Sequence, residues 1–317
     1  MCPPDFDDDD DDPVERTQAI SIADLMKGAN PEERRLTATL TCIAGKAAGR
    51  VYRLDASENV LGRMSEIAVP IEDDGVSRKH AQIVRMNVGS HILADLGSRN
   101  GTIHNGIRIT EPVVLRDGDR IRIGVNTVFK FGYQDELEEQ MQARLYDSAT
   151  RDPLTLAYNR RYFSERLASE WAFAKRHHSA CALVAIDADH FKRVNDTYGH
   201  QTGDYVLKSL VIVTQRVVRK EDLLARVGGE EFMVLARGTE RPSAIVLAER
   251  IRVAVEAFPF EFEGKSLVVT ISLGVSTSDD LGVETPEEMV GRADDYLYRA
   301  KEHGRNRVEP PLTPDMK

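Results

Sequence analysis

The chain has 317 residues, of which 41% are hydrophobic and 30% charged, a composition typical of a soluble protein with two domains of ~150 residues each. The net charge of −10 argues against a non-specific nucleic-acid binder, which needs a basic face. The three cysteines are far apart and odd in number, so they predict neither a disulfide framework nor a metal motif and fit a reducing cytosol. No run approaches the ~18 apolar residues of a membrane helix, and the acidic N-terminus lacks the apolar core of a signal peptide. We therefore expect a cytoplasmic protein that is not inserted in a membrane and does not bind nucleic acid.

Residues 1–34 are predicted to form a disordered acidic arm. Asp7 to Asp12 is an uninterrupted acidic run, and prolines stand at positions 3, 4 and 13. Blocks of like charge repel one another and stay solvated. The arm also contains Thr17, whose significance depends on the region that follows.

Residues 35–133 contain short apolar or alternating runs, separated by Gly, Asn and Asp, which are typical of a β-sandwich. Three of the expected loops carry polar residues: Gly62–Arg63, Ser77–His80 and Ser98–Thr102. Turn chemistry alone can explain any single loop, Asn100-Gly101 in particular. Taken together, the three loops resemble the forkhead-associated (FHA) domain family, and the resemblance covers the whole region.

The FHA resemblance implies an eleven-stranded sandwich that recognises phosphothreonine at its loop tips. A phosphate dianion accepts strong, charge-assisted hydrogen bonds from guanidinium and hydroxyl groups. By this match Arg63 and Ser77 are expected to hold the phosphate, with Arg78 and Arg99 nearby. Asn100 is expected to bind the main chain of the ligand. Some members of the family bind unphosphorylated partners, which is the alternative.

Thr17 is a candidate phosphorylation site within the arm. FHA domains often discriminate the residue three places after the phosphothreonine, and Ile20 stands at that position. A tethered ligand has a high effective concentration, so our hypothesis is that phospho-Thr17 is a ligand within the same chain or across a dimer. The alternatives are a phosphothreonine peptide of another protein and an incidental threonine in a tail.

Residues 134–150 are predicted to form a linking helix. Gln134 to Ser148 holds good helix formers and neither Gly nor Pro. Every fourth residue is apolar along one stripe, Tyr133, Leu137, Met141 and Leu145. The stripe is too short for a coiled coil, so it packs on either domain or pairs across a dimer. We favour a signalling helix that transmits the geometry of the sandwich to the following domain.

Residues 151–309 alternate helical and strand patterns and predict an α+β domain around a mainly antiparallel sheet, followed by a short tail, 310–317. The expected elements in chain order are helix Arg160 to His177, strand Cys181 to Ile186, helix Thr202 to Val218, hairpin Leu223 to Leu235, helix Pro242 to Ala257, strand Leu267 to Gly274 and helix Pro286 to Lys301. The chain is thus expected to carry an all-β sandwich followed by an α+β domain.

Two carboxylates stand at the tip of the predicted hairpin. Leu223 to Val227 and Phe232 to Leu235 are the strands, and Gly228-Gly229 between them can supply the positive φ of a primed turn. The bare glycine backbone lets a phosphate approach, and Glu230 and Glu231 suit a Mg²⁺–triphosphate site. For an isolated hairpin, a merely solvated acidic turn is the alternative. The stretch resembles the Gly-Gly-Glu-Glu-Phe signature of the GGDEF family of diguanylate cyclases, which implies a palm-like cyclase domain.

A second acidic stretch, Asp187 to Asp189, ends an apolar strand. Open sheets bind ligands at the carboxyl ends of their strands, and burying Asp187 there without a cation would be costly. The family pattern implies that Asp187, the Ala188 carbonyl and Glu230 hold Mg²⁺ or Mn²⁺. Asp189 is equally compatible with capping the next helix.

The stretch Asn195 to Asp204 also resembles the family, which implies that Asn195 and Asp204 recognise guanine. A carboxylate offers two acceptors to the N1–H and N2–H donors of guanine, a pair that adenine lacks, so Asp204 favours GTP over ATP. The other expected substrate contacts are cations for the triphosphate, a pocket wall and the glycine backbone: Lys192, Lys301, Arg305, Phe191, Gly228 and Gly229. Ordinary surface charge is the alternative for these cations.

The resemblance implies that the 3′-hydroxyl of one GTP attacks the α-phosphorus of another, giving cyclic di-GMP and pyrophosphate. A divalent metal polarises the phosphoryl group and lowers the pKa of the attacking hydroxyl. Glu230 is the candidate for assisting deprotonation, and Glu231 and Lys192 are the other candidate catalytic groups. One domain cannot present both nucleotides, so a homodimer of two facing half-sites is implied, with catalysis that is mostly positioning.

Arg219-Lys220-Glu221-Asp222 has the spacing of the inhibitory R-x-x-D site of the family. Arg219 and Asp222 are expected to bind the product cyclic di-GMP, and a surface salt bridge is the alternative. The domain start departs from the family pattern, because Leu156 replaces Gly and Ala157 replaces Leu, which questions the local turn but not the metal site. The leading interpretation is a diguanylate cyclase regulated by an FHA domain. The alternatives are a silent GGDEF domain that only binds cyclic di-GMP, and a phosphopeptide adaptor.

Overall fold

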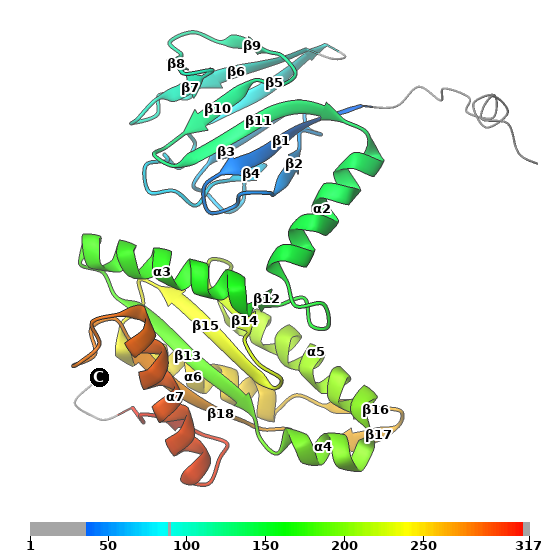
Figure 1. Cartoon of the computed structure of the whole chain (residues 1–317), viewed down its shortest axis with the longest axis vertical. Helices are drawn as coiled ribbons and strands as arrows, with labels where there is room; N and C mark the ends of the chain where they lie inside the picture. Colours follow the sequence, from blue (N-terminus) through cyan, green and yellow to red (C-terminus); the bar gives the residue numbers. More distant parts are fainter. Residues whose placement is uncertain (1–35, 88–89, 313–317) are drawn as a thin grey trace, which may run out of the picture. The chain divides into compact units, whose positions relative to one another are not determined.

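The computed structural model describes residues 36–87 and 90–312 of the chain. The predicted acidic arm with Thr17 and residues 313–317 of the predicted tail lie outside the described residues. The described residues form an all-β region followed by an α+β region, and each region has buried apolar clusters of its own (Figure 1). This arrangement confirms the predicted fold class.

The all-β region is a sandwich of two sheets. Its strands are β1 Thr37–Ala44, β2 Val51–Arg53, β3 Glu58–Gly62, β4 Val69–Pro70, β5 Ala81–Asn87, β6 Ser90–Asp95, β7 Thr102–His104, β8 Ile107–Arg108, β9 Val113–Leu115, β10 Arg120–Ile123 and β11 Thr127–Gln134. Within the described residues they form one sheet in the order β2-β1-β11-β10-β7-β8 and another in the order β4-β3-β5-β6-β9. Neighbouring strands are antiparallel except β3 and β4, which are parallel.

The core of the sandwich follows from the alternation of buried and exposed residues along its strands. In β10, for example, Ile121 and Ile123 are fully buried, whereas the arginines beside them are exposed. Phe129 and Phe131 of β11 point to the same core, and the ring of Phe129 meets the edge of Tyr52 with centroids 6.0 Å apart. The two sheets are therefore held by apolar packing, and their connecting loops are left to carry polar residues.

The linking helix α2 spans Glu136–Thr150, two residues later than the sequence predicts. Asp135 caps its N-terminus and forms a capping box with Glu138, which sets the start of the helix. The two residues before this cap belong to β11, where they pair with β1. The predicted stripe is therefore reduced to Leu137, Met141 and Leu145, which are 73%, 63% and 61% exposed.

The α+β region is built on one mixed sheet. Its strands are β12 Tyr158–Asn159, β13 Cys181–Ala188, β14 Leu223–Arg226, β15 Glu231–Arg237, β18 Ile271–Thr277 and β19 Val308–Glu309, in the order β12-β14-β15-β13-β18-β19. The inner pairs are antiparallel, and only the two outermost pairs are parallel. The mainly antiparallel sheet of the prediction is thus confirmed.

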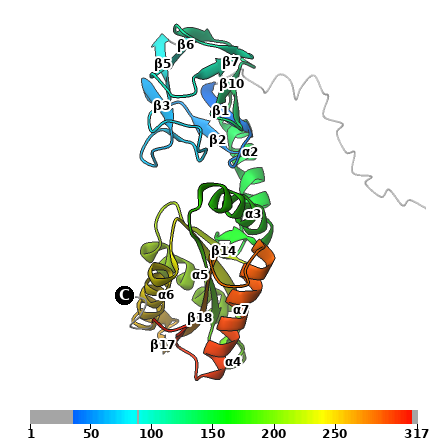
Figure 2. The ribbon, with the colours of Figure 1, turned by 90° about the vertical axis from the view of Figure 1, so that its left-hand side faces the viewer.

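Helices cover both faces of this sheet. They are α3 Arg160–His177, α4 Phe191–Tyr198, α5 His200–Val217, α6 Arg241–Glu256 and α7 Pro286–Glu302. One buried cluster joins the sheet to α5 and α6, and another joins it to α3 and α7, so the two pairs of helices lie on opposite sides of the sheet (Figure 2). Every residue of β13 and β18 is buried as a result, which is why β13 appears in the sequence as an unbroken apolar run.

In this region the clearest differences from the predicted elements concern two helices and one strand. A short helix, α4, precedes α5, and α5 begins at His200 rather than Thr202. The predicted strand Leu267 to Gly274 is divided, because Leu267 ends a separate hairpin, β16 Phe260–Phe262 with β17 Lys265–Leu267, while β18 begins at Ile271. A continuous apolar pattern does not show which partner each part of it pairs with.

Leu156 stands where the family pattern has glycine, and its backbone conformation is unusual for leucine. Leu156 has φ 60°, a left-handed conformation that glycine adopts without strain. The turn around it is held by Asp152, whose carboxylate accepts hydrogen bonds from the main-chain N and Oγ1 of Thr155 at 2.8 and 2.7 Å. The turn that the sequence placed in doubt therefore forms, with leucine in a position that suits glycine.

Candidate functional site

The carboxyl end of β13 and the tip of the β14–β15 hairpin lie at the same edge of the sheet. Asp187 of β13 pairs in register with Glu231 of β15 on one side and with Ser272 of β18 on the other. The next residue, Ala188, donates its main-chain N–H to the carbonyl of Glu230 at 3.3 Å. The structure thus brings together the two acidic stretches that are 43 residues apart in the sequence, Asp187 and Glu230.

The two glycines of the hairpin tip do not form a primed turn. Neither Gly228 nor Gly229 has a φ between +20° and +160°, so the predicted two-residue primed turn is wrong. The connection is longer, because β14 ends at Arg226 and β15 begins at Glu231. A Cβ on Gly228 would lie 2.2 Å from Oε2 of Glu231, whereas a Cβ on Gly229 would meet no atom within 4 Å. The tip is therefore bare and open at Gly229.

Arg226 holds the backbone of the hairpin tip in place through its guanidinium group. Its Nε and Nη2 donate to the carbonyl oxygen of Gly229 at 3.1 and 2.6 Å. Its Nη1 donates to Oδ1 of Asp152 at 3.0 Å, and both side chains of this ion pair are largely buried. The start of the α+β region is thereby bonded directly to the hairpin. Sequence reasoning missed Arg226, whose position two residues before the glycine pair was the only local signal.

The carboxyl groups of Asp187 and Glu230 at this edge are both harder to ionise than usual. Asp187 is only 4% exposed, and its burial raises the pKa of its carboxyl above the usual range. Burial, and then the negative charge of Asp187, raise the pKa of Glu230 as well. Nζ of Lys301, from α7, pairs with Oδ2 of Asp187 at 2.8 Å and only partly offsets the burial. These carboxylates therefore favour a positive partner.

The same edge has the donor set that a hard divalent cation prefers. Asp187 and Glu230 bring carboxylate groups to this edge, and Ala188, whose carbonyl is the third expected ligand, is bonded to Glu230 through its main-chain N–H. Over the described ranges no group of three or more His, Cys, Asp and Glu side chains is arranged to hold a metal. A cation at this edge would thus rely on two carboxylates and main-chain or ligand oxygens, a pattern that fits Mg²⁺ bound together with phosphate.

Asp189 does not cap the helix that follows it. The N-cap of α4 is His190, with φ 55° and no side-chain capping bond. Asp189 instead accepts hydrogen bonds from Thr270 Oγ1 at 2.7 Å, from Ser272 Oγ at 2.6 Å and from the main-chain N of Asn306 at 3.0 Å. It ties β13 to β18 and to the loop after α7, so it is a structural organiser of the site. The capping alternative is therefore wrong.

The predicted guanine contacts lie where α4 meets α5. Phe191 is buried in the core, and Asp204 is exposed. Oδ1 of Asn195 is buried yet has no hydrogen-bond partner among the described residues. A Cβ on Gly203 would lie 1.9 Å from this oxygen, so glycine is what lets α5 approach Asn195. Asn195 and Asp204, the two predicted guanine contacts, are thus brought together through Gly203, the neighbour of Asp204.

The predicted triphosphate cations come from α4 and from the end of α7. Lys192 and Arg305 are exposed and form no ion pair in the part of the chain that the structure describes. Arg305 has φ 62°, and its main-chain N bonds to the carbonyl of Ala300 at 2.9 Å. Lys301 already contacts Asp187. Of the three predicted cations, only Lys301 is thus seen to contact a predicted metal ligand.

Arg219 and Asp222 form a turn that borders a cavity. The main-chain N of Arg219 donates to Oδ2 of Asp222 at 2.8 Å, and burial raises the pKa of that carboxyl. Oδ1 of Asp222 is buried without a partner among the described residues. The cavity is about 460 Å³ and is lined by both residues together with Pro242 and Arg250. The alternative of a side-chain salt bridge between Arg219 and Asp222 is not seen in the described residues.

The polar loops of the sandwich converge around Ser77. Its carbonyl accepts from the main-chain N of Arg63 at 3.0 Å, and its Oγ accepts from the main-chain N of Arg99 at 3.2 Å. Nδ2 of Asn100 donates to the carbonyl of Gly75 at 2.8 Å. Predicted ligand contacts from three separate loops, including the exposed side chain of neighbouring Arg78, therefore lie together.

The imidazole of His80 forms hydrogen bonds with two of these loops. It is fully buried, and its Nδ1 accepts from the main-chain N of Ser77 at 3.1 Å. Its Nε2 lies 3.2 Å from the carbonyl of Gly101, so the imidazole bridges two of the three loops. Both ring nitrogens are used in this way, which makes His80 part of the framework of the site.

Comparison with known proteins identifies both regions. The family description "Diguanylate cyclase, GGDEF domain" matches residues 149–307, and the FHA domain family matches residues 59–124. Diguanylate cyclase DgcP of Pseudomonas aeruginosa is 42% identical over 177 residues, which are 56% of this chain and 25% of that protein. Diguanylate cyclase A of Treponema denticola is 45% identical over 127 residues, which are 40% of this chain and 34% of that protein. The chain thus spans about a quarter to a third of the length of these relatives.

A solved structure shares the fold of the α+β region. The coiled coil and GGDEF domain of DgcB from Caulobacter crescentus, crystallised in complex with c-di-GMP, superposes with a TM-score of 0.51 at 32% identity. The match covers 55% of this chain and 91% of that one. Among the residues that the structure describes, no helix has the length and apolar character needed to cross a membrane.

Proposed function

Because the chain belongs to the GGDEF diguanylate cyclase family, we propose that it condenses two molecules of GTP into cyclic di-GMP and pyrophosphate. The observation that carries the proposal is the meeting of Asp187 and Glu230 at one edge of the sheet, beside a bare glycine tip. Both carboxyls have raised pKa values because they are buried, so this edge favours a cationic cofactor and its anionic substrate.

Asp187, the Ala188 carbonyl and Glu230 are the residues that would hold Mg²⁺ or Mn²⁺. When bound there, the ion would polarise the α-phosphoryl group and lower the pKa of the attacking 3′-hydroxyl. The chain itself supplies a candidate proton acceptor, because Glu230 brings a carboxylate to the hairpin tip beside the proposed ion. Glu231 and Lys192 complete the proposed catalytic groups.

Asn195 and Asp204 orient the guanine of the substrate. The exposed carboxylate of Asp204 offers two acceptors for the N1–H and N2–H groups, a donor pair that ATP lacks, and Asn195 lies next to it across Gly203. Phe191 forms the wall of the base pocket, and the backbone of Gly228 and Gly229, which is open at Gly229, receives the triphosphate. Three cations balance the triphosphate charge: Lys192, Lys301 and Arg305.

Two copies of the chain must meet for turnover, because each site binds one GTP and the reaction joins two. The homodimer positions one 3′-hydroxyl against the other α-phosphorus, so catalysis depends mainly on geometry. The exposed stripe of α2, Leu137, Met141 and Leu145, is available for pairing the two copies.

The sandwich regulates this reaction by binding a phosphothreonine peptide. The binding loops carry Arg63, Ser77, Arg78, Arg99 and Asn100. The ligand is the chain's own arm phosphorylated at Thr17 or a peptide of another protein.

The product binds at Arg219 and Asp222 and inhibits the enzyme. This role is supported by the unpaired buried oxygen of Asp222 next to a cavity.

The experiment is turnover of purified protein with GTP and Mg²⁺, after treatment with a cyclic di-GMP phosphodiesterase to remove bound product. Chromatography of the nucleotides is expected to show cyclic di-GMP from the wild type and at least a hundredfold less from Glu230→Gln, because a metal ligand and a proton acceptor are lost together. Glu261→Gln, an exposed carboxylate of the same domain, is the matched control and should retain full activity.

Absence of product from dimeric, product-free wild type would contradict the cyclase proposal. Binding of cyclic di-GMP that is lost in Arg219→Ala would then identify the chain as a receptor for this nucleotide.

A further inference from the structure

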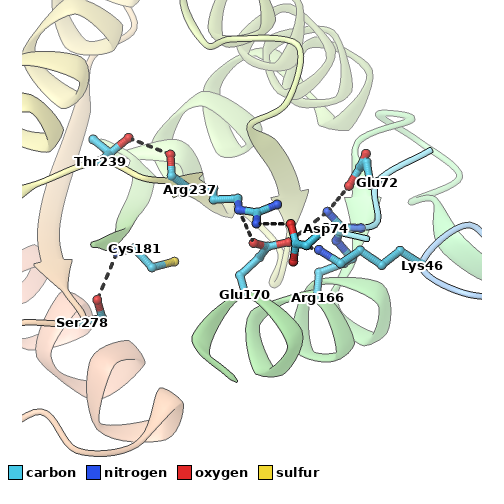
Figure 3. Close-up of polar contacts among 9 residues, drawn as sticks. All are labelled: Lys46, Glu72, Asp74, Arg166, Glu170, Cys181, Arg237, Thr239 and Ser278. Carbon is cyan, nitrogen blue, oxygen red and sulfur yellow. Dashed lines mark hydrogen bonds and ion pairs between the residues drawn. The ribbon is translucent and has the colours of Figure 1, made fainter. Parts of the chain in front are cut away.

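A buried carboxylate on α3 is surrounded by charges from distant parts of the chain. Glu170 is 4% exposed, and its Oε1 accepts from Nζ of Lys46 at 2.6 Å. Nη2 of Arg166 lies 3.4 Å from the same oxygen, and Nε of Arg237 lies 3.4 Å from Oε2 (Figure 3). Two further carboxylates complete the group, which we call the Glu170 cluster: Lys46, Glu72, Asp74, Arg166, Glu170 and Arg237.

The Glu170 cluster joins the FHA sandwich to the cyclase domain. Nη2 of Arg166 donates to Oε2 of Glu72 at 2.5 Å, and Nη2 of Arg237 donates to Oδ1 of Asp74 at 2.7 Å. The bonded partners are 94 and 163 residues apart in the sequence. The cluster contains three cations and three carboxylates, so its charges balance only when both domains contribute.

A cluster of this kind specifies an arrangement better than it stabilises a fold. Removing charges from water costs several kcal/mol per ion, and the attraction between them largely repays this cost only when the geometry is correct. Glu170 meets that condition through cations on three sides. Because Lys46 comes from the sandwich, separating the domains would remove one of the three cations that offset the burial of Glu170.

The loop that carries Glu72 and Asp74 also belongs to the FHA binding site. Asp73 holds it in shape by accepting from the main-chain N of Gly75 at 2.9 Å and from the main-chain N of Asn126 at 3.0 Å. The carbonyl of Gly75 accepts from Nδ2 of Asn100, the residue proposed to bind the ligand main chain. Glu72 and Asp74 of this short loop therefore contact the cyclase domain, while the carbonyl of Gly75 in the same loop contacts Asn100.

A second contact starts from the neighbouring recognition loop. Nζ of Lys220 donates to the carbonyl of Ser65 at 2.7 Å. Ser65 follows Arg63 by two residues, and Lys220 stands between Arg219 and Asp222 of the proposed product site. Both contacts thus link a ligand-binding loop of the sandwich to the cyclase domain.

We propose that the Glu170 cluster couples the phosphothreonine-binding loops to the cyclase domain through the loop 72–75. A ligand that shifts Asn100 shifts the carbonyl of Gly75, and with it the carboxylates that bind Arg166 and Arg237. Coupling between two sites is reciprocal, so a change on the cyclase side of the cluster must also reach the recognition loop. The inference rests on the proposed role of the FHA loops, but the contact itself is testable without nucleotide or phosphopeptide.

The test is hydrogen–deuterium exchange of the full chain, read by mass spectrometry in the domain that was not altered. Arg237→Gln lies in the cyclase domain, and its side chain is only half-buried, so the variant is expected to fold. It should raise exchange about two- to five-fold in the segments 72–78 and 98–102 of the sandwich, the range expected when the partly exposed ion pair with Asp74 is lost. The longer contact of Arg237 with Glu170 is lost in the same variant. Arg216→Gln, an exposed arginine of α5, is the matched control and should leave both segments unchanged.

The reciprocal arm uses Asp74→Asn, which lies in the sandwich. It should raise exchange in the cyclase segment 236–240, while exchange in the central strand 181–188 stays as in the wild type. Unchanged exchange in 72–78 on Arg237→Gln would overturn the contact. A response in 72–78 that stops before 98–102 would overturn the coupling to the recognition loop. Both outcomes are independent of whether the chain makes cyclic di-GMP, so failure of this inference is distinguishable from failure of the proposed function.

Discussion

Replacing Leu156 by glycine should stabilise the cyclase domain without altering its catalysis. Leu156 has φ 60°, and its side chain is 65% exposed. A left-handed conformation costs a non-glycine residue roughly 1–2 kcal/mol. Glycine avoids this cost, but it increases the conformational entropy of the unfolded chain, which lowers the free energy of unfolding by about 0.4–1 kcal/mol. The side chain is mostly in water, so little apolar contact is lost, and the expected gain in the free energy of unfolding is about 0.5–1 kcal/mol.

Urea unfolding followed by tryptophan fluorescence can measure this gain. The only tryptophan, Trp171, lies in α3 and is buried in the cyclase domain, so its signal reports on that domain. A gain of this size should raise the melting temperature by about 1–4 °C for a domain of this length. Leu156→Ala is the control, since it removes the side chain but keeps the strained backbone. If Leu156→Gly were no more stable than Leu156→Ala, backbone strain at this turn would not be the explanation.

Three further predictions concern the site and its support. Arg226→Leu removes two hydrogen bonds to the Gly229 carbonyl and a largely buried ion pair, so kcat should fall roughly tenfold or more as the hairpin tip loses its position. Gly203→Ala places a Cβ against Oδ1 of Asn195 at a buried position, so KM for GTP should rise roughly tenfold and the free energy of unfolding should fall by about 1–3 kcal/mol. Burial opposes ionisation of Asp280, but hydrogen bonds to its carboxylate hold its pKa below the usual range. Its stabilising effect is therefore complete above the unfolded pKa of about 4 and is lost as the pH falls further, so Asp280→Asn should show a smaller loss of stability under acid.

Matched variants separate these effects from general damage. Arg216→Leu removes an exposed arginine and should leave kcat unchanged, so an equal fall in both arginine variants would contradict the role of Arg226. Gly291→Ala adds a Cβ to a helix glycine with no atom within 4 Å, and KM should not change. For Asp280, equal acid sensitivity of wild type and variant in urea unfolding would show that this carboxylate does not titrate as described.

The strongest local patterns in the sequence gave correct elements. The helix Arg160–His177 appears as predicted, and the predicted strand Cys181 to Ile186 forms the start of β13, which continues to Ala188. A strand buried on both faces and a long amphipathic helix leave clear signals in a sequence. The predicted strand Leu267 to Gly274 was wrong in its extent, since Leu267 pairs with Phe260 rather than continuing into the central sheet. Pairing partners are set by tertiary structure, which a local pattern does not contain.

Sequence reasoning could not predict the contacts that organise the site, because these contacts also depend on the tertiary structure. Asp189 bonds to Thr270 and Ser272, which are more than eighty residues away. Arg226 bonds to Asp152 across 74 residues. The sequence shows which groups each residue carries, but it does not show which distant residue each group bonds to. By contrast, the meeting of Asp187 with Glu230 was predicted, because both follow from the ends of adjacent strands.

The central claim is tested most directly by supplying the purified dimer with equal amounts of GTP and ATP in the presence of Mg²⁺. Mass spectrometry should then find cyclic di-GMP and pyrophosphate from the wild type, no adenine-containing dinucleotide, and no product from Asp187→Asn. Formation of cyclic di-GMP by Asp187→Asn at the wild-type rate, or equal use of ATP, would contradict the assignment of this edge of the sheet as a guanine-specific cyclase site.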